Sequence, residues 1–306
     1  MKKLKNILRL LLYFIAFAAI VLYIVFISVN QETKTMDAAA RKNVAGQFIQ
    51  LTDGITHYEA GGPDTGKTVI LVHGFSVPYY IWNGTFDSLV RQGFRVIRYD
   101  EFGRGYSDRP SVVYEPAFYR KQLFELIQLL HLKTPVSLAG VSFGGAVVTD
   151  FATHYPAMTD KIVLIDPVYH FRDAGPSEAI TNYVMAVKHE KQAEGQLDDL
   201  KYPQQFPDWV KNYKVQMQYK GFRHALISTI MNYPGDTIIN NYRKLNTLHK
   251  NILLVWGKED QTVPFNFSDS LQQILHPEFF PVADARHLPY LEKPAIVNPK
   301  IISFLK

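Results

Sequence analysis

The 306-residue sequence predicts an α/β protein: a mostly parallel sheet flanked by helices, with an inserted helical cap and an N-terminal transmembrane helix. From about residue 46 onward, short β-type runs alternate with helical stretches, which favours a parallel sheet covered on both faces. The alternation stops over residues 168–247, where helical patterns dominate and little β signal remains. An uncharged run of twenty residues, 10–29, precedes all of this.

The composition limits the classes of protein that need to be considered. A hydrophobic content of 47% and an aromatic content of 13% are typical of a globular chain. The absence of cysteine excludes disulfides, thiolate zinc sites, cysteine nucleophiles and lipid-modified cysteines. Four positive charges lie within the first nine residues, so the net charge of +5 leaves about +1 for the rest. The basic charge therefore does not support a nucleic-acid partner.

The apolar run 10–29 predicts an uncleaved membrane anchor. A helix of twenty residues spans about 30 Å, the hydrocarbon thickness of a bilayer. A secretory signal has a shorter apolar region, about 7–15 residues, followed by small residues, whereas "NQETKT" follows this run. A cleaved signal and a buried core helix remain the alternatives. The basic cluster before the span predicts a cytoplasmic N-terminus, with the rest of the chain on the extracytoplasmic side.

After the anchor region, 1–30, residues 31–45 are expected to form a polar tether. The α/β core is expected over 46–167 and 248–306, and the cap over 168–247. The core begins with a hairpin of 47–51 and 56–60, turned at Asp53-Gly54. The remaining strands are expected at 68–73, 94–100, 135–140, 161–167, 251–257 and 278–284. The core helices are expected at 81–93, 116–132, 144–155, 266–275 and 290–305.

The stretch "GVSFGG", 140–145, fits the pattern G-x-S-x-G at the junction of a buried strand and a helix. A sharp turn there puts Ser142 in a strained conformation and exposes its Oγ atom. Gly140 and Gly144 flank it because a side chain at either position would meet neighbouring backbone. The helix N-terminus favours developing negative charge. The sequence thus predicts a nucleophile elbow, the alternative being a tight turn with an incidental serine.

A serine nucleophile needs a base, and the base needs an orienting acid. His287 is the predicted base, because it lies between the last expected strand and the last expected helix, at the catalytic edge of such a sheet. Asp260, just after the strand 251–257, is the predicted acid. Asp166, which ends the strand near 161–166, is the second candidate for the acid. The chain order Ser142, Asp260, His287 is the order expected for this kind of sheet.

The tetrahedral oxyanion needs two backbone N–H donors. Phe143, the residue after the nucleophile, is predicted to supply one. Phe75 is predicted to supply the other from the loop that follows the strand 68–73. Gly74 lets the backbone turn inward at this loop, and His73 is expected to shape the loop without serving as a second base.

Five motifs in this order resemble the α/β-hydrolase superfamily. They are "HGF" (73–75), "DEFGRGYSDRP" (100–110), "GVSFGG" (140–145), "GKEDQTVP" (257–264) and "RHLPYLEKP" (286–294). The chain looks most like monoacylglycerol lipases and small carboxylesterases, including membrane-anchored forms, and it also looks like hydrolases of carbon–carbon bonds in ring-fission products. Epoxide hydrolases and haloalkane dehalogenases of this fold carry aspartate where this chain has Ser142, which counts against both.

The resemblance implies a function for the whole chain. We expect a membrane-anchored serine hydrolase of carboxylic esters, with an apolar acyl substrate and no metal or organic cofactor. The alternatives are a carbon–carbon bond hydrolase, with Arg172, Arg223 and Arg286 as candidate substrate contacts, and a catalytically inactive binding module. The family's loop after the fourth strand matches Asp100, Gly103, Arg104, Gly105 and Ser107, which are expected to build a turn, the alternative being contact with the substrate. The cap is rich in large apolar residues, some expected in its core and some in an acyl pocket: Tyr169, Phe171, Tyr183, Met185, Phe206, Trp209, Tyr213, Met217 and Phe222.

Overall fold

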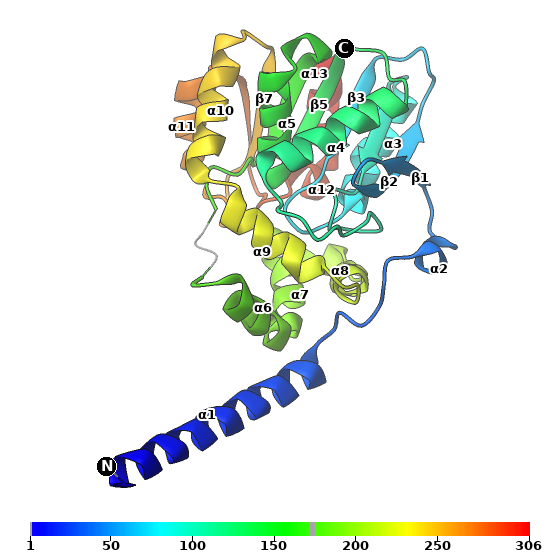
Figure 1. Cartoon of the computed structure of the whole chain (residues 1–306). Coiled ribbons are helices and arrows are strands. Elements are labelled where there is room, and N and C mark those ends of the chain that lie inside the picture. Colours follow the sequence, from blue (N-terminus) through cyan, green and yellow to red (C-terminus); the bar gives the residue numbers. More distant parts are fainter. Residues whose placement is uncertain (1, 172–174) are drawn as a thin grey trace.

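The computed structural model describes residues 2–171 and 175–306, and it shows a central sheet between two layers of helices (Figure 1). In the described part of the chain the sheet has eight strands, in the order β1-β2-β4-β3-β5-β6-β7-β8. The pairs β1/β2 and β2/β4 are antiparallel, and every other pair is parallel. The strands are β1 (Gln47–Leu51), β2 (Gly54–Gly61), β3 (Thr68–Val72), β4 (Arg95–Tyr99), β5 (Val136–Val141), β6 (Thr159–Ile165), β7 (Ile252–Gly257) and β8 (Glu278–Val282). The predicted fold class is confirmed.

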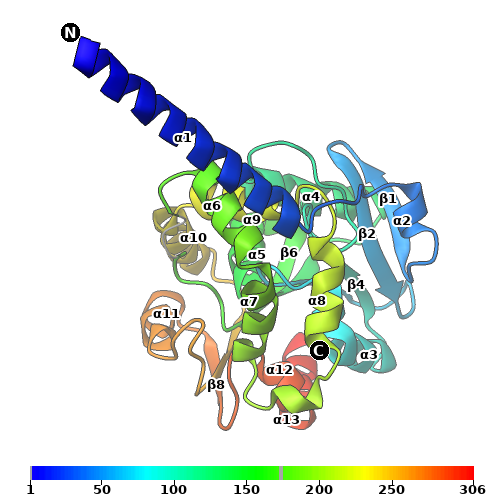
Figure 2. The ribbon, with the colours of Figure 1, turned by 90° about the horizontal axis from the view of Figure 1, so that it is seen from below.

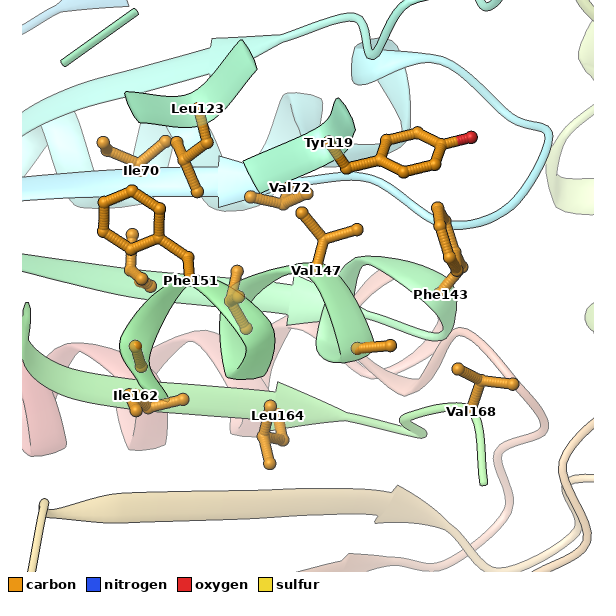
Figure 3. Packing of buried hydrophobic residues seen from close by; sticks show 14 of the residues in the cluster. Ile70, Val72, Tyr119, Leu123, Phe143, Val147, Phe151, Ile162, Leu164 and Val168 are labelled. Atoms are coloured by element: carbon orange, nitrogen blue, oxygen red, sulfur yellow. The ribbon is translucent and has the colours of Figure 1, made fainter. Parts of the chain in front are cut away.

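The central strands are mostly apolar because both faces of the sheet are covered. Every residue of β3, β5 and β7 is buried. Successive side chains point to opposite faces: Ile70 and Val72 join one core cluster, whereas Val69 and Leu71 join the other. Figure 3 shows the first cluster between the sheet and two of the flanking helices.

Helices form a layer on each face. The first cluster includes residues of α4 (Pro116–Leu129), α5 (Phe143–His154), α10 (Gly235–Thr247) and α11 (Phe267–Leu275). The second includes residues of α3 (Asn83–Arg91) and α13 (Pro294–Leu305). The expected closing helix 290–305 is divided into α12 (Pro289–Glu292) and α13, with Lys293 at φ −127° and ψ 52° between them. The break follows from Pro294, because a residue that precedes proline disfavours the α conformation.

The segment between β6 and β7 carries additional helices at the carboxyl edge of the sheet (Figure 1). They are α6 (Glu178–Val187), α7 (His189–Glu194), α8 (Trp209–Met217) and α9 (Phe222–Asn232), with the short helices η3 (Gly195–Asp199) and η4 (Pro203–Gln205) between α7 and α8. α6 packs against α9, and α7 packs against α8. α10, which the sequence placed in the cap, packs instead against α5 and α11 at the side of the sheet. The structure therefore groups α10 with the layered part of the fold.

The N-terminal helix α1 (Lys2–Val29) projects from the rest of the molecule (Figures 1 and 2). Among the described residues it is the one helix long and apolar enough to cross a membrane, with a mean hydropathy of 2.9 in its most apolar window. The following segment, expected to be a tether, makes specific contacts. Lys34 forms backbone hydrogen bonds with Gln218 and Lys220 beside α8 and α9. Arg41, in the short helix α2 (Ala38–Arg41), forms an ion pair with Asp108.

Candidate active site

Ser142 lies at the turn between β5 and α5, where it is the N-cap residue of the helix. Its backbone has φ 52° and ψ −118°, a conformation that an L-residue rarely adopts. The Ser142 N–H donates to the carbonyl of Ile165, and the Ser142 carbonyl accepts from the N–H groups of Gly145 and Val168. These hydrogen bonds hold the strained backbone, and strain held by its surroundings in this way is a feature of functional sites.

Two glycines let the backbones meet at this turn. A Cβ atom on Gly140 would lie 2.3 Å from the carbonyl oxygen of Gly144. A Cβ atom on Gly144 would lie 2.4 Å from the carbonyl oxygens of both Val72 and His73. Both approaches are shorter than real Cβ contacts allow. The G-x-S-x-G spacing therefore has a packing reason as well as the predicted chemical one.

His287 and Asp260 form a buried pair at the same edge of the sheet. Asp260 follows β7, and its Oδ2 atom lies 2.7 Å from Nδ1 of His287. The other oxygen, Oδ1, accepts from the backbone N–H groups of Thr262 and Val263, which fixes the carboxylate. His287 is 3% exposed and Asp260 is 5% exposed. With the Nδ1 proton directed at Asp260, Nε2 of His287 remains for proton exchange.

The electrostatics of the pair favour a protonated imidazole. Burial alone would lower the pKa of His287, but the Asp260 carboxylate raises it by charge and by hydrogen bonding, and the charge of Asp199 adds to this. The net result is a pKa above the ordinary value of 6.5. A base of raised pKa close to a carboxylate is well suited to accept a proton and to hold it as a cation.

Asp166, the second candidate acid, ends β6 and lies close to the pair. Its side chain is fully buried, and its Oδ1 atom accepts from the backbone N–H of Gly257 at 2.8 Å. Burial and then the charge of Asp260 raise its pKa well above the usual range. This direction favours the protonated, neutral form of Asp166, and a neutral acid does not stabilise an imidazolium as a carboxylate does.

Potential ligand atoms of Asp166, Asp260 and His287 lie within 4.8 Å of one another. A metal ion held by all three would compete with the His287–Asp260 hydrogen bond for the same atoms. It would also need Asp166 ionised, against the direction of its pKa. The arrangement therefore suits a hydrogen-bonded catalytic pair better than a metal centre.

The loop after β3 places Phe75 beside the N-terminus of α5. The rings of Phe75 and Phe143 meet edge to face, with centroids 6.2 Å apart. A Cβ atom on Gly74 would lie 3.4 Å from Cβ of Ser142, so this loop runs close to the serine. His73 is buried and its pKa is lowered to about 4, mainly by burial, so the ring is neutral. Its Nδ1 donates to the carbonyl of Gly74 and its Nε2 accepts from the N–H of Glu101.

Arg104 holds the loop that carries Phe75 through a hydrogen bond, a role that was not predicted from the sequence. It was expected to build a turn, yet its Nε donates to the carbonyl of Phe75 at 2.9 Å. The guanidinium is fully buried and also donates to Tyr119 and Thr229. The arginine between two glycines of this motif was the available signal in the sequence, but its partner could not be identified without the fold.

A cavity of about 770 Å³ contains both Ser142 and His287 in its lining. Its apolar lining is Phe75, Val77, Ile81, Val141, Val168, Phe171, Ile230, Val263 and Leu288. Its polar lining includes Ser76, His170, Gln196, Asp198, Asp199, Gln261, Thr262 and Arg286. Of the nine large cap residues named from the sequence, Phe171 lines this cavity, whereas Trp209, Tyr213, Met217 and Phe222 are buried in the second core cluster.

The candidate arginines for an anionic substrate are separated in the structure. Arg286 lines the cavity, and its Nε has no hydrogen-bond partner among the described residues. Arg223 lies in α9 and donates to Asn30 and Asn182, away from the described lining of the cavity. Arg172 lies outside the described residues.

Known proteins resemble this chain over most of its length. The carboxylesterase YbfK of Bacillus subtilis is 25% identical over 84% of this chain and 86% of its own. A 2-hydroxy-6-oxo-2,4-heptadienoate hydrolase of Pseudomonas putida is 26% identical over 71% of this chain and 83% of its own. The structure of a thermophilic esterase from Thermogutta terrifontis superposes with a TM-score of 0.71, at 23% identity over 85% of this chain and 98% of that one. The model of the α/β-hydrolase-fold family matches residues 67–294, and the chain therefore belongs to this family of hydrolases.

Proposed function

We propose that the protein is a membrane-anchored serine hydrolase that cleaves carboxylic esters through Ser142, His287 and Asp260. The observation that carries the proposal is the buried His287–Asp260 hydrogen bond of 2.7 Å beside a cavity that Ser142 also lines. The strained backbone of Ser142 at the N-terminus of α5 supports the same assignment.

The mechanism assigns each group one task. The Oγ atom of Ser142 attacks the acyl carbonyl while Nε2 of His287 takes its proton. The backbone N–H groups of Phe75 and Phe143 stabilise the tetrahedral oxyanion. His287 then protonates the leaving alcohol, and a water molecule repeats the cycle on the acyl-enzyme. Asp260 holds the imidazole in the required tautomer and stabilises its charge.

An ester substrate fits the relatives and the cavity. One relative is a carboxylesterase, and the cavity volume lies within the range usual for small-molecule sites. The apolar lining suits an acyl chain. The polar lining on the η3 side, with Gln196 and Asp199, suits an alcohol group that carries hydrogen-bond donors. A monoacylglycerol has both features.

Carbon–carbon bond hydrolysis is the second candidate, because one relative performs it and because the Nε of Arg286 is unpartnered among the described residues. Such substrates carry a carboxylate. Asp198 and Asp199 lie in the same cavity lining as Arg286, and their charge would repel that group. The ester assignment is therefore preferred.

Anchoring through α1 completes the proposal. Residues 10–29 are uncharged, and the basic residues before them favour a cytoplasmic N-terminus with the hydrolase domain on the extracytoplasmic side. The substrate would then be met at or near a bilayer.

The test is a series of p-nitrophenyl esters from acetate to decanoate, with the full chain in vesicles and Ser142→Ala as the control. Each buried methylene contributes up to about 0.8 kcal/mol, so two should raise kcat/KM roughly tenfold until the cavity is full. We expect a maximum at medium chains and no activity in Ser142→Ala. A maximum at acetate would indicate a short-chain esterase. Cleavage of vinylogous diketone acids without ester cleavage would establish the second candidate.

A further inference from the structure

Helix α6 exposes a regular apolar stripe on its outer face. Ile180, Val184 and Val187 follow one another at helical spacing, and they are 53%, 40% and 43% exposed. Tyr183 lies on the same face by its position in the helix. Single exposed apolar residues are ordinary on protein surfaces, but a row along one helix face marks a contact surface. We call these four residues the α6 stripe.

The opposite face of α6 packs against the rest of the cap. Asn182 accepts a hydrogen bond of 2.7 Å from Nε of Arg223 in α9, and Ala186 is fully buried. α6 and α9 pack against each other. The helix therefore cannot rotate to bury its stripe without breaking these contacts.

The membrane-spanning candidate ends beside this stripe. The ring of Phe26, in the last turn of α1, stacks on Tyr183 with centroids 6.2 Å apart. The guanidinium of Arg223 also lies over the ring of Phe26, 5.8 Å from its centroid. Figure 2 shows α1 running alongside α6 where it meets the cap.

The residues that follow α1 fix its position relative to the cap. The two oxygens of Glu32 accept from the backbone N–H groups of Gly221 and Arg223, at 2.9 and 2.6 Å, at the start of α9. Arg223 also donates to Asn30 at 2.7 Å. Glu32, which belongs to the segment after α1, thus binds the N-terminus of α9, where the helix dipole favours a negative charge. Arg223, which also binds Asn182 of α6, therefore connects α1 to α6 in addition to the contact through Phe26.

We infer that α6 is an interfacial helix whose stripe inserts into the surface of the bilayer that α1 spans. This inference rests on the proposed anchoring. If α1 crosses the bilayer and ends at Val29, Phe26 lies at the level where the chain leaves the membrane, and Tyr183 lies beside it. The stripe then faces the boundary between headgroups and acyl chains, where amphipathic helices bury their apolar face about 5–10 Å deep.

A lipid surface suits the stripe for two reasons. The α6 stripe lies next to α1, and the apolar side chains of α1 are themselves exposed along the helix. Tyr183 is an amphipathic residue of the kind that gathers at membrane interfaces, and the exposed Lys188 follows the stripe, where its ammonium can reach lipid phosphates. Held in this way, the cap would keep the cavity close to lipid substrates.

The test uses the natural absence of cysteine. Single cysteines are introduced at Val184, Val187, Ile20 and Lys244 in the full chain, and each is labelled with an environment-sensitive nitrobenzoxadiazole dye. Ile20 reports on the span, and Lys244, exposed on α10 far from α1, is the water-exposed control. The proteins are placed in phosphatidylcholine vesicles with or without nitroxide-labelled lipid. We expect blue-shifted, lipid-quenched emission at 20, 184 and 187, and water-like emission at 244.

The possible results separate this inference from the proposed function. Quenching at 20 with water-like emission at 184 and 187 would overturn the interfacial role of α6 and leave the anchor intact. Water-like emission at 20 as well would overturn the anchoring itself. Ester cleavage is not the readout in either case, so the hydrolase assignment does not affect the outcome.

Discussion

Replacing Asp260 by asparagine changes one charge at the proposed site and little else. The amide oxygen can still accept from the N–H groups of Thr262 and Val263, so the loop after β7 keeps its hydrogen bonds. The amide NH₂ would face Nδ1 of His287 and place the imidazole proton on Nε2. A base protonated there cannot take the proton of Ser142. Loss of the correct tautomer costs about 10⁴-fold in kcat in a well-studied serine protease, or about 5.5 kcal/mol.

The same substitution should shift the pH dependence of kcat/KM in a defined direction. His287 must be neutral to act as the base, so kcat/KM of the unchanged protein should rise with pH and level off above its pKa. This pKa lies above 6.5 because Asp260 outweighs the effect of burial. In Asp260→Asn the effect of burial is opposed by Asp199 alone, and the rising limb should move to lower pH.

Asp166 supplies a further check on the residual activity. The charge of Asp260 helps to raise the pKa of Asp166, so removing this charge lets Asp166 ionise more readily. Residual activity in Asp260→Asn should therefore fall further in the double variant with Asp166→Asn. The assay is kcat/KM for a p-nitrophenyl ester from pH 5 to 10, with circular dichroism as the folding control. Full activity in Asp260→Asn together with an inactive Asp166→Asn would refute the acid assignment, and an unchanged rising limb would refute the electrostatic reasoning.

Three other predictions test separate parts of the molecule. Full-length protein should sediment with membranes and resist alkaline carbonate, because twenty apolar residues insert stably; soluble protein shortened at its N-terminus would indicate a cleaved signal. Gly144→Ala should lower the free energy of unfolding by about 1–3 kcal/mol in denaturant titrations, because its Cβ would meet two carbonyl oxygens at 2.4 Å; unchanged stability would show that the turn relaxes. Burial raises the pKa of Glu101 from 4.5 to about 8, and neither of its side-chain oxygens accepts a hydrogen bond from the described residues. The fold therefore loses stability between pH 4.5 and 8, by at most about 5 kcal/mol, and Glu101→Gln should remove this loss in unfolding curves measured at both pH values.

Much of the fold and the close placement of the candidate residues could be predicted from the sequence, because those features depend on local patterns of apolar and polar residues. The runs that became β3, β5 and β7 are mostly apolar, as is usual for strands buried on both faces. Ser142, Asp260 and His287 each lie just after an expected strand. Parallel strands bring such positions to one edge of a sheet, where the structure indeed gathers them.

The remaining features depend on contacts between distant parts of the chain. Arg104 reaches the carbonyl of Phe75, and Glu32 reaches α9 across nearly two hundred residues of sequence. α10 has a helical pattern that fits a cap or a core layer equally well, and only its packing against α5 and α11 decides. The break at Lys293 could have been read from Pro294, since the residue before proline is restricted locally.

The most direct test of the central claim is to treat the full-length protein with a fluorophosphonate and map the modified peptide by mass spectrometry. Only an activated serine attacks phosphorus at a useful rate. We expect a single stoichiometric adduct on Ser142, none in Ser142→Ala and greatly slowed labelling in His287→Ala. An unlabelled protein that is folded by circular dichroism, or an adduct on another serine, would contradict the claim.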